Sequence, residues 1–440
     1  MKNIILISTF LIFLSTSVSA STAPNIQEIR LSLDSVWVVV GGILVFFMQA
    51  GFALIESGSV RSKNTVNVLM KNYMDTCIGG IIFWLFGFGL MFGLNQTGWI
   101  GWGYFMPSQL DDWHWNLLFF QMMFAATATT IASGAMAERI HFVAYVVSAI
   151  FVSGVIYPIF GSWAWGGLFG GDGWLKALGF IDFAGSTVVH SIGGWVALAG
   201  IIVLGPRLGR FGRKGQSHFL AGHNLPLVAL GGFILWFAWF GFNAASTVAA
   251  SVSIGRIALN THLAACAAAS TYMILALLQS KAVLMRHTIN ASLAGLVAIT
   301  AGCATMSPPF AIITGAIAGF LITFVPQFIE KMQLDDVVDA VTVHGVCGAW
   351  GTLAAGIFFE KALFNLDIIL VQALGVGAAL IWGFGASFIM FKLLDKLLGG
   401  LRVSQQHEQR GLDYTEHAEL SYPEFQRDVT FETENITHRH

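Results

Sequence analysis

The segment D-F-A-G-S-T-V-V-H-S-I-G-G, Asp182 to Gly194, decides the fold, because it carries a histidine into an apolar run long enough to cross a membrane. A second segment, D-V-V-D-A-V-T-V-H-G-V-C-G from Asp336 to Gly348, has the same eight-residue step from Asp to His. At about 1.5 Å per residue, this step carries each histidine about 12 Å along its helix, and half of a hydrocarbon core is about 15 Å. We therefore expect His190 and His344 near the midplane of a bilayer, where they meet if the two segments enter from opposite faces.

The composition indicates a polytopic membrane protein. Of 440 residues, 56% are hydrophobic and only 10% are charged, and soluble domains carry far more charge. The net charge of -2 and the lack of runs of one sign argue against a nucleic-acid partner. The four cysteines form no C-x-x-C motif and fall in apolar runs, so we predict free, buried thiols and neither a disulfide nor a metal site.

The N-terminal residues have the pattern of a signal peptide. Lys2 supplies the positive start, Ile4 to Leu14 form an apolar stretch, and Val18, Ser19 and Ala20 form a small-residue cleavage site. We predict a signal peptide over residues 1–20 and an exported mature N-terminus. The alternative is a retained extra helix.

Eleven apolar runs in the remaining sequence are long enough to cross a bilayer. The predicted fold is therefore an all-α polytopic membrane protein with a membrane domain over 30–398. Beyond Leu398 the chain becomes polar and charged, so we predict a cytoplasmic C-terminal tail over 399–440, disordered from Ser421 onward. The runs lie at 34–57, 74–94, 116–137, 142–162, 184–205, 226–243, 258–279, 288–304, 309–329, 341–360 and 367–394.

The distribution of basic residues sets the predicted orientation. Loops after the odd-numbered runs hold nearly all of the lysines and arginines, whereas the intervening loops carry only Lys176, Arg256 and Lys361. By the positive-inside rule, the N-terminus lies outside and the C-terminus lies in the cytoplasm. We therefore expect a multi-pass protein of a bacterial-type inner (cytoplasmic) membrane.

This orientation gives the two histidine segments opposite directions. The run with His190 enters from outside, and the run with His344 enters from the cytoplasm, five runs later. An odd separation reverses topology, as in an inverted repeat with a site at the midplane between the halves. We predict a 5+5 inverted repeat followed by one extra helix.

Each histidine segment begins with a carboxylate. Asp182 directly precedes a helix start, where it can accept from free backbone N–H groups, and we favour this N-cap role over direct ligation of a cation. Asp336 has the equivalent position in the second segment, although Asp335 beside it competes for the role.

The histidine pair itself admits three interpretations. Two buried imidazoles can bond neighbouring helices, ligate a haem, or share a proton and line a path for something in transit. Ionisable groups at membrane depth are usually functional. Because no second histidine pair lies at comparable depth, we disfavour a b-type haem and predict no cofactor.

Five motifs occur in the order typical of a known family. They are A-E-R-I (Ala137 to Ile140), D-F-A-G-S-T-V-V-H, W-F-G-F-N (Trp239 to Asn243), V-H-G-V-C-G, and G-L-R-V (Gly400 to Val403) followed by G-L-D (Gly411 to Asp413). Through them the chain resembles the ammonium transporter family, Amt/Mep/Rh, from about residue 34 to 418. One departure is Ser186, where many relatives have Gly.

The resemblance implies a role for further residues, each through its own motif. Trp165 in A-W-G-G, Phe120 in F-F-Q and Ser246 after W-F-G-F-N match an outer ammonium-binding site. Phe124 and Phe242 match the stacked pair that closes the pore below it.

The resemblance also implies what lies beyond the closed pair. Trp239 resembles a pore-lining residue there, and His190 and His344 continue the pore. Ammonium and potassium are similar in size and charge, so selectivity must use the N–H donors and the removable proton of ammonium. We therefore expect ammonium to bind, to lose its proton near the closed pair, and to pass the histidines as ammonia.

Partners follow from the same resemblance. Family members form homotrimers, their tails dock under the pore, and a PII-type signal protein can plug the exit. Arg402, Gly411, Leu412 and Asp413 match such a tail, and Thr415 lies where plant relatives carry a regulatory phosphorylation site.

A second functional class remains open from sequence. The same fold can serve an ammonium sensor with little or no flux and a signalling tail, although the sequence shows no kinase or cyclase output domain. No nucleophile, metal set or phosphate loop occurs at a position identified as pore-lining, so we expect no enzyme.

Overall fold

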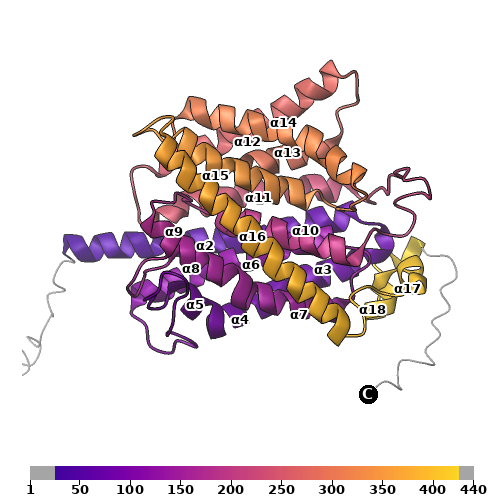
Figure 1. Cartoon of the computed structure of the whole chain (residues 1–440), viewed down its shortest axis with the longest axis horizontal. Coiled ribbons are helices and arrows are strands. Elements are labelled where there is room, and N and C mark those ends of the chain that lie inside the picture. The colour runs from indigo at the N-terminus through magenta and orange to yellow at the C-terminus, as the bar shows by residue number, and fades with distance from the viewer. Residues whose placement is uncertain (1–24, 426–440) are drawn as a thin grey trace, which may run out of the picture.

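The computed structural model describes residues 25–425, and within this range the fold is all-helical, as predicted, with only isolated β-bridges besides. The helices pack side by side along one general direction (Figure 1). The first helix projects at one end of the bundle, and the last two lie at the other end, which we call the tail end. The predicted signal peptide lies outside the described residues.

The helices follow the predicted apolar runs. They are α2 (Ile26–Ser59), α3 (Thr65–Met74), α4 (Gly80–Ile82), α5 (Phe88–Phe92), α6 (Asp112–Ala135), α7 (Phe142–Phe151), α8 (Tyr157–Trp165), α9 (Trp174–Ala177), α10 (Ile192–Leu204), α11 (Leu225–Ala244), α12 (Ile254–Leu278), α13 (Met285–Ile299), α14 (Pro308–Lys331), α15 (Cys347–Ile357), α16 (Leu366–Leu397), α17 (Gln405–Arg410) and α18 (Leu412–His417). Single π-helical turns join or precede some of them: η2 (Asp75–Gly79), η3 (Phe83–Gly87), η4 (Val152–Ile156), η5 (Ser186–Ser191) and η7 (Val341–Val346).

The number of membrane crossings is only partly settled by length. Between residues 25 and 425, 9 helical segments are long and apolar enough to cross a membrane. The predicted runs at 288–304 and 341–360 correspond to shorter helices, α13 with 15 residues and the apolar segment Val341–Ile357. The count of eleven crossings and their orientation stay predictions.

The first helix begins earlier than the apolar run predicts. α2 starts at Ile26 instead of residue 34, because Asn25 and Glu28 form a capping box that satisfies the free N–H groups of its first turn. Gln27, Glu28 and Arg30 make this turn polar, so hydropathy alone could not show it.

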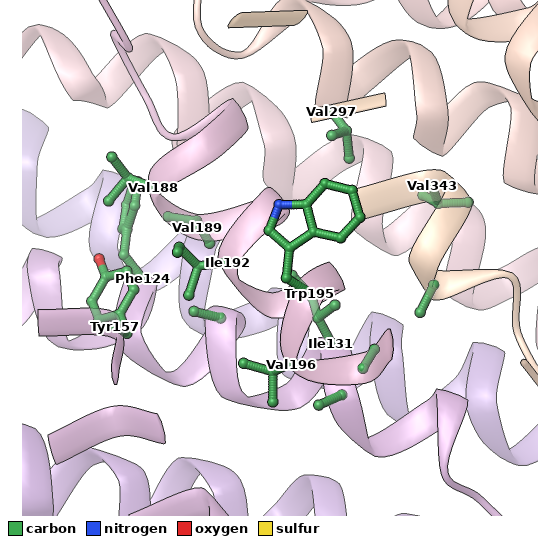
Figure 2. Packing of buried hydrophobic residues seen from close by; sticks show 14 of the residues in the cluster. Phe124, Ile131, Tyr157, Val188, Val189, Ile192, Trp195, Val196, Val297 and Val343 are labelled. Carbon is green, nitrogen blue, oxygen red and sulfur yellow. The ribbon is translucent and has the colours of Figure 1, made fainter. Parts of the chain in front are cut away.

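Small residues allow α12 and α14 to approach each other closely. A Cβ on Gly315 of α14 would lie 2.1 Å from the carbonyl oxygen of Ala264 on α12, and one on Gly319 would lie 2.4 Å from that of Ala268. Elsewhere, apolar side chains from distant segments interdigitate around α10 (Figure 2). Val188, Val189, Ile192 and Val196 are fully buried there, so the surroundings of His190 are dry and tightly packed.

The outer surface of the bundle is apolar, as contact with lipid requires. Ile381 is 78% exposed, Phe233 69% and Phe328 62%. An exposed apolar surface of this extent would aggregate in water, whereas acyl chains cover it in a bilayer.

Two smaller predictions are wrong. Cys77 is exposed and Cys266 only half-buried, because their helix positions face outward, while Cys303 and Cys347 are buried thiols as predicted. The tail remains ordered past Ser421, whose hydroxyl donates to Asp413 at 2.6 Å. The predicted disorder beyond Phe425 lies outside the described residues.

Candidate functional site

The two histidines lie in equivalent local structures. His190 is in η5, which leads into α10, and His344 is in η7, which leads into α15. A π-helical turn inserts one extra residue per turn and is frequent at functional sites. The short sequence repeat is therefore also a repeat of backbone geometry.

The two imidazoles meet inside the protein. Nδ1 of His190 lies 3.2 Å from Nδ1 of His344, and the ring centroids are 5.3 Å apart with planes at 25°. Facing nitrogens form a hydrogen bond only when one carries a hydrogen and the other does not, so the pair holds one proton between them. Nε2 of His190 is buried without a hydrogen-bond partner among the described residues, which leaves it available to a molecule in transit.

Glycines at matching positions let the two copies approach. Gly194 and Gly348 each lie four residues after their histidine. A Cβ on Gly194 would lie 2.2 Å from the backbone nitrogen of Gly345, and one on Gly348 would lie 2.3 Å from the carbonyl oxygen of Ser186. The backbones therefore touch where no side chain fits, and this contact fixes the distance between the imidazoles.

Asp182 caps the start of η5 with both carboxylate oxygens. Oδ1 accepts from the N–H groups of Gly185 and Ser186 at 2.9 and 2.8 Å, and Oδ2 accepts from Thr187 and Val188 at 2.9 and 2.8 Å. Gly185, at φ 111°, supplies the left-handed turn that folds the chain around the carboxylate. Burial raises the pKa of Asp182 to about 6, although the four N–H groups oppose this shift. With both oxygens engaged, the geometry matches the N-cap role better than cation ligation.

Asp336 caps the second copy less completely. It accepts from the N–H of Val338 at 3.3 Å and from that of Val341 at 2.8 Å. Burial, helped by the charge of Asp339, raises the pKa of Asp336 to about 6 as well. Asp335 does not compete for this cap, since its carboxylate is engaged elsewhere.

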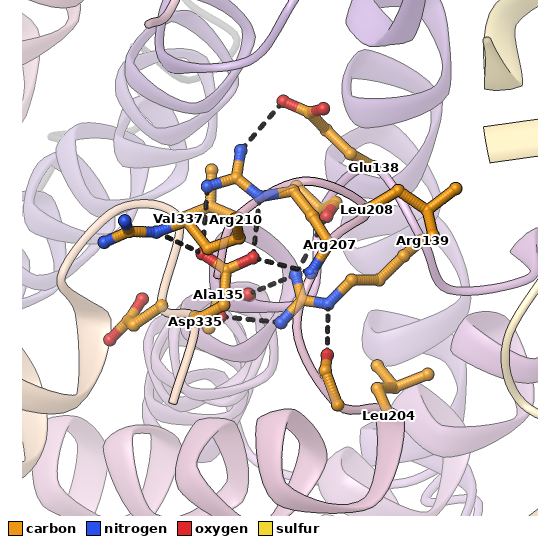
Figure 3. A network of polar contacts seen from close by, with 12 residues as sticks. Ala135, Glu138, Arg139, Leu204, Arg207, Leu208, Arg210, Asp335 and Val337 are labelled. Carbon is orange, nitrogen blue, oxygen red and sulfur yellow. Dashed lines mark hydrogen bonds and ion pairs between the residues drawn. The ribbon is translucent and has the colours of Figure 1, made fainter. Parts of the chain in front are cut away.

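Asp335 belongs to a buried ion network at the tail end (Figure 3). Arg207 donates from Nε at 2.8 Å and from Nη2 at 3.0 Å to the two oxygens of Asp335, and from Nη1 to Glu138 at 3.0 Å. Burial alone would raise the pKa of Asp335, but these hydrogen bonds and the charges of Arg139 and Arg207 hold it well below its usual range. Arg139 also donates to the carbonyl oxygen of Asp335 at 2.6 Å, so the network anchors the loop that leads to Asp336.

A series of aromatic ring contacts reaches His190. Phe124 and Phe242 stack with centroids 4.1 Å apart and are 1% and 0% exposed. Phe120 lies 4.6 Å from Phe124, and Trp165 meets Phe124 edge-on at 6.3 Å. Phe242 in turn lies 5.2 Å from the ring of His190. The rings thus form one continuous string.

Two further predicted residues join this string. Trp239 stacks on His190 with centroids 4.9 Å apart and donates from Nε1 to the hydroxyl of Thr300 at 2.9 Å. Ser246 donates to the carbonyl oxygen of Phe242 at 2.8 Å, which leaves its hydroxyl oxygen as an acceptor. All predicted binding, gate and pore residues therefore lie in one connected arrangement.

The comparisons with known proteins identify the family of the chain. The family model of the Ammonium Transporter Family matches residues 36–422. The chain belongs to the ammonium transporter family. Ammonium transporter Amt2 of Archaeoglobus fulgidus is 43% identical over 457 residues, which cover 96% of each chain. Ammonium transporter 1 member 3 of Solanum lycopersicum is 36% identical over 89% of this chain and 93% of the relative.

Solved structures of ammonium transporter relatives have the same fold. A structure named Sensor Amt Protein is 42% identical, with a TM-score of 0.86 over 89% of this chain and 100% of that one. Candida albicans Mep2 is 25% identical, with a TM-score of 0.78 over 88% of this chain and 90% of that one.

The tail of this ammonium transporter family member docks on the start of α3 and on the residue before it. The carboxylate of Asp413 accepts from the N–H of Asn67 at 2.9 Å, and the N–H of Leu412 donates to Asn64 at 2.9 Å. Arg402 donates to Glu408 at 2.7 Å and to the carbonyl oxygen of Leu204 at 3.0 Å. Gly411, at φ 108°, provides the turn between α17 and α18. The hydroxyl of Thr415 donates to the carbonyl oxygen of Gly411 at 3.0 Å.

Sequence reasoning missed the polar residues on the tail side of the histidine pair. Glu56, Lys71 and Asp75 are all at most 2% exposed. Glu56 and Asp75 fall within predicted apolar runs, and ionisable residues at membrane depth are functional candidates by default. That signal was present, but no motif singled them out.

Proposed function

We propose that this protein conducts ammonium, as ammonia with a separately handled proton, across the cytoplasmic membrane. Ammonium binds at Phe120, Trp165 and Ser246, loses its proton near the gate of Phe124 and Phe242, and passes the pore of His190, His344 and Trp239 as ammonia. The observation that supports this most strongly is the string of rings that ends in the 3.2 Å contact between the imidazoles.

The chemistry of each stage supports the assignment. Aromatic faces attract a desolvated cation, and the hydroxyl oxygen of Ser246 accepts an N–H bond that potassium cannot donate. A charge in an apolar membrane interior costs about 3 kcal/mol on insertion scales, whereas neutral ammonia avoids this cost. Past the gate, neutral ammonia can form hydrogen bonds with the imidazole nitrogens.

Topology and assembly form part of the same proposal. We place eleven helices in an inner membrane with the N-terminus outside, so the tail end faces the cytoplasm and the signal peptide is removed. By the family resemblance, the protein is a homotrimer, and a PII-type signal protein is a candidate partner at the tail end. We expect no enzymatic turnover, because ammonium changes only by loss and regain of a proton.

Transport is tested with purified protein in proteoliposomes. An ammonium jump should produce a current, and labelled methylammonium should accumulate. His190→Ala should lower both at least tenfold, since it removes a buried imidazole nitrogen that has no hydrogen-bond partner among the described residues. Glu360→Gln, a half-exposed residue that forms an ion pair with Arg256, serves as the matched control and should change neither. Full flux through His190→Ala would overturn the proposed pathway.

A sensor is the second candidate, favoured by the similarity to the structure named Sensor Amt Protein. A sensor would bind ammonium tightly and show little or no flux, and its docked tail would carry the signal. Methylammonium uptake into transport-deficient cells separates the two. Binding without uptake, accompanied by a change in protease cleavage of the tail, would favour the sensor.

A further inference from the structure

A small cavity lies on the tail side of the histidine pair. Its volume is about 20 Å³, and His344, Glu56 and Asn290 line it together with apolar residues such as Phe52 and Leu293. A water molecule needs a cavity of at least about 10–15 Å³ and two or more polar partners. The cavity therefore suits one water that touches both the imidazole and the carboxylate.

Hydrogen bonds from neighbouring helices hold the carboxylate of Glu56 in place. It lies one helical turn after Phe52, whose ring centroid is 5.9 Å from that of His344. Its Oε2 accepts from the amide of Asn72 and from the hydroxyl of Ser133, both at 2.9 Å. These bonds fix the position of a buried carboxylate that lines the same cavity as His344.

Gly134 opens the space between Glu56 and the loop before η7. A Cβ at position 134 would lie 2.7 Å from Val338 and 3.0 Å from the carboxyl carbon of Glu56. Any side chain here would push Glu56 away from the segment that carries His344. The close approach therefore depends on glycine.

Glu56 is part of a buried cluster that also contains Lys71 and Asp75. Lys71 donates from Nζ to the carbonyl oxygen of Ser133 at 3.1 Å and lies 5.1 Å from the ring centre of Tyr145. Tyr145 donates to Asp75 Oδ2 at 2.6 Å. The hydroxyl and carbonyl of Ser133 thus connect the carboxylate of Glu56 to the ammonium group of Lys71.

The cluster can take up one proton when Glu56, Asp75 and Lys71 are all ionised. Two carboxylates and one ammonium group sum to one uncompensated negative charge, which is unfavourable when buried. The hydroxyl of Thr130 has one hydrogen but two neighbours, Gln49 Oε1 at 2.8 Å and Asp75 Oδ2 at 3.2 Å. A proton on Asp75 removes both deficits, whereas a proton on Glu56 removes only the charge deficit.

We propose that Glu56 is the proton acceptor on the tail side of the histidine pair, a role that rests on the proposed transport function. Nε2 of a protonated His344 gives its proton to the cavity water, and that water gives a proton to the carboxylate of Glu56. The cationic imidazole and the anionic carboxylate both become neutral, and the water is regenerated. Release of the proton from Glu56 to solvent at the tail end resets the site.

Glu56→Gln tests the relay because it keeps the shape and removes the basic group. The ammonium-driven current should fall at least tenfold. Ammonia flux, followed by internal alkalinisation at a pH above the pKa of free ammonium, should stay within twofold. Glu360→Gln is again the control. A merely structural role would lower both readouts in proportion, and an unchanged current would also overturn the relay.

A second pair of measurements covers the case in which Glu56→Gln does not fold. Ammonium-induced infrared difference spectra of the wild-type protein should show a new protonated-carboxyl band, and Glu56→Asp should shift that band and keep part of the current. Absence of the band from wild-type protein that takes up methylammonium would overturn the role of Glu56. Wild-type protein without any flux would instead refute the proposed function.

Discussion

The two histidine copies share a sequence pattern and a π-helical turn, yet the rest of the molecule holds them differently. In the first copy, Asp182 accepts from four N–H groups and the hydroxyl of Thr187 lies 2.6 Å from that of Thr352. In the second, Asp336 accepts from two N–H groups and the buried hydroxyl of Thr342 has no partner among the described residues. The repeat therefore positions both imidazoles, but rigidity is concentrated in the first copy.

The surroundings of the two copies also differ, and the first copy again has the more tightly packed neighbours. The first copy faces the closely stacked rings of Phe124 and Phe242, which in the proposed function must keep their spacing to exclude a hydrated ion. The second copy lies beside the cavity with Glu56 and beside the ion network of Arg207 and Asp335. We infer that the first copy selects what enters, while the second is placed next to groups that can exchange protons.

The largest difference between the copies should appear when the caps are removed. Asp182→Ala leaves four N–H groups without an acceptor, and each such loss costs about 1 kcal/mol or more. The free energy of unfolding in detergent should fall by on the order of 4 kcal/mol, against on the order of 2 kcal/mol for Asp336→Ala. Asp172→Ala, at an exposed ion pair, is the control. Equal decreases in the free energy of unfolding would show that the number of N–H groups bonded to each aspartate does not measure the rigidity of its copy.

The glycine contacts should respond alike in both copies. Gly194→Ala and Gly348→Ala each push a Cβ into backbone atoms, at 2.2 and 2.3 Å, and overpacking of this kind costs on the order of 3 kcal/mol. Folded yield and methylammonium uptake should both drop. Gly345→Ala meets only the ring of Trp195 at 3.1 Å and should be milder, and Gly385→Ala has open space around it. If Gly194→Ala kept its folded yield and its uptake, the backbone contact at Gly194 would not set the distance between the imidazoles.

The threonines offer an almost isosteric comparison. Thr187→Val breaks the hydrogen bond with Thr352 and leaves the buried hydroxyl of Thr352 without this partner. The free energy of unfolding should therefore fall by about 1 kcal/mol. Thr342→Val removes a buried hydroxyl that has no partner between residues 25 and 425, so it should leave stability unchanged or raised. Thermal unfolding in the same detergent measures both, and the reverse order would contradict the assignment of the rigid copy.

The smallest effect concerns the tail, which covers the end of the molecule nearest the second copy. Nδ1 of His141 lies 3.1 Å from Glu416. The hydrogen bond to Glu416 raises the pKa of His141 above 6.5, against the effect of burial. Burial acts to raise the pKa of Glu416, but its bonds to His141 and to the N–H of Phe142 bring it below 4.5.

The pH dependence follows from these two shifts. The contribution of His141 is complete below pH 6.5 and is lost as the pH rises through its raised pKa, and that of Glu416 is lost as the pH falls through its lowered pKa. Docking should therefore weaken on the alkaline side, by less than about 1 kcal/mol for a partly exposed pair. Limited proteolysis of the tail across pH measures this, and Glu416→Gln should flatten the profile whereas Glu424→Gln should not. Cleavage that rises with pH equally in Glu416→Gln would exclude the pair as the cause.

The sequence predicted most of the candidate site because its residues sit in motifs with a fixed order. His190, His344 and the predicted gate pair Phe124 and Phe242 could all be named this way. The polar cluster around Glu56 escaped because its members come from α2, α3, η2, α6 and α7 and share no local pattern. The early start of α2 escaped because a capping box, not hydropathy, determines it.

By itself, the sequence determined that the chain is helical and membrane-embedded, since an apolar interior without water leaves helices as the way to satisfy the backbone. It also predicted that two histidines lie at similar depths, because periodicity and spacing are local properties. Only the tertiary structure decided that the imidazoles touch, that Asp335 pairs with Arg207 and leaves Asp336 as the cap, and that Glu56 reaches the cavity of His344. Those outcomes depend on contacts between residues far apart in the chain, where ångström differences in backbone approach select one partner over another.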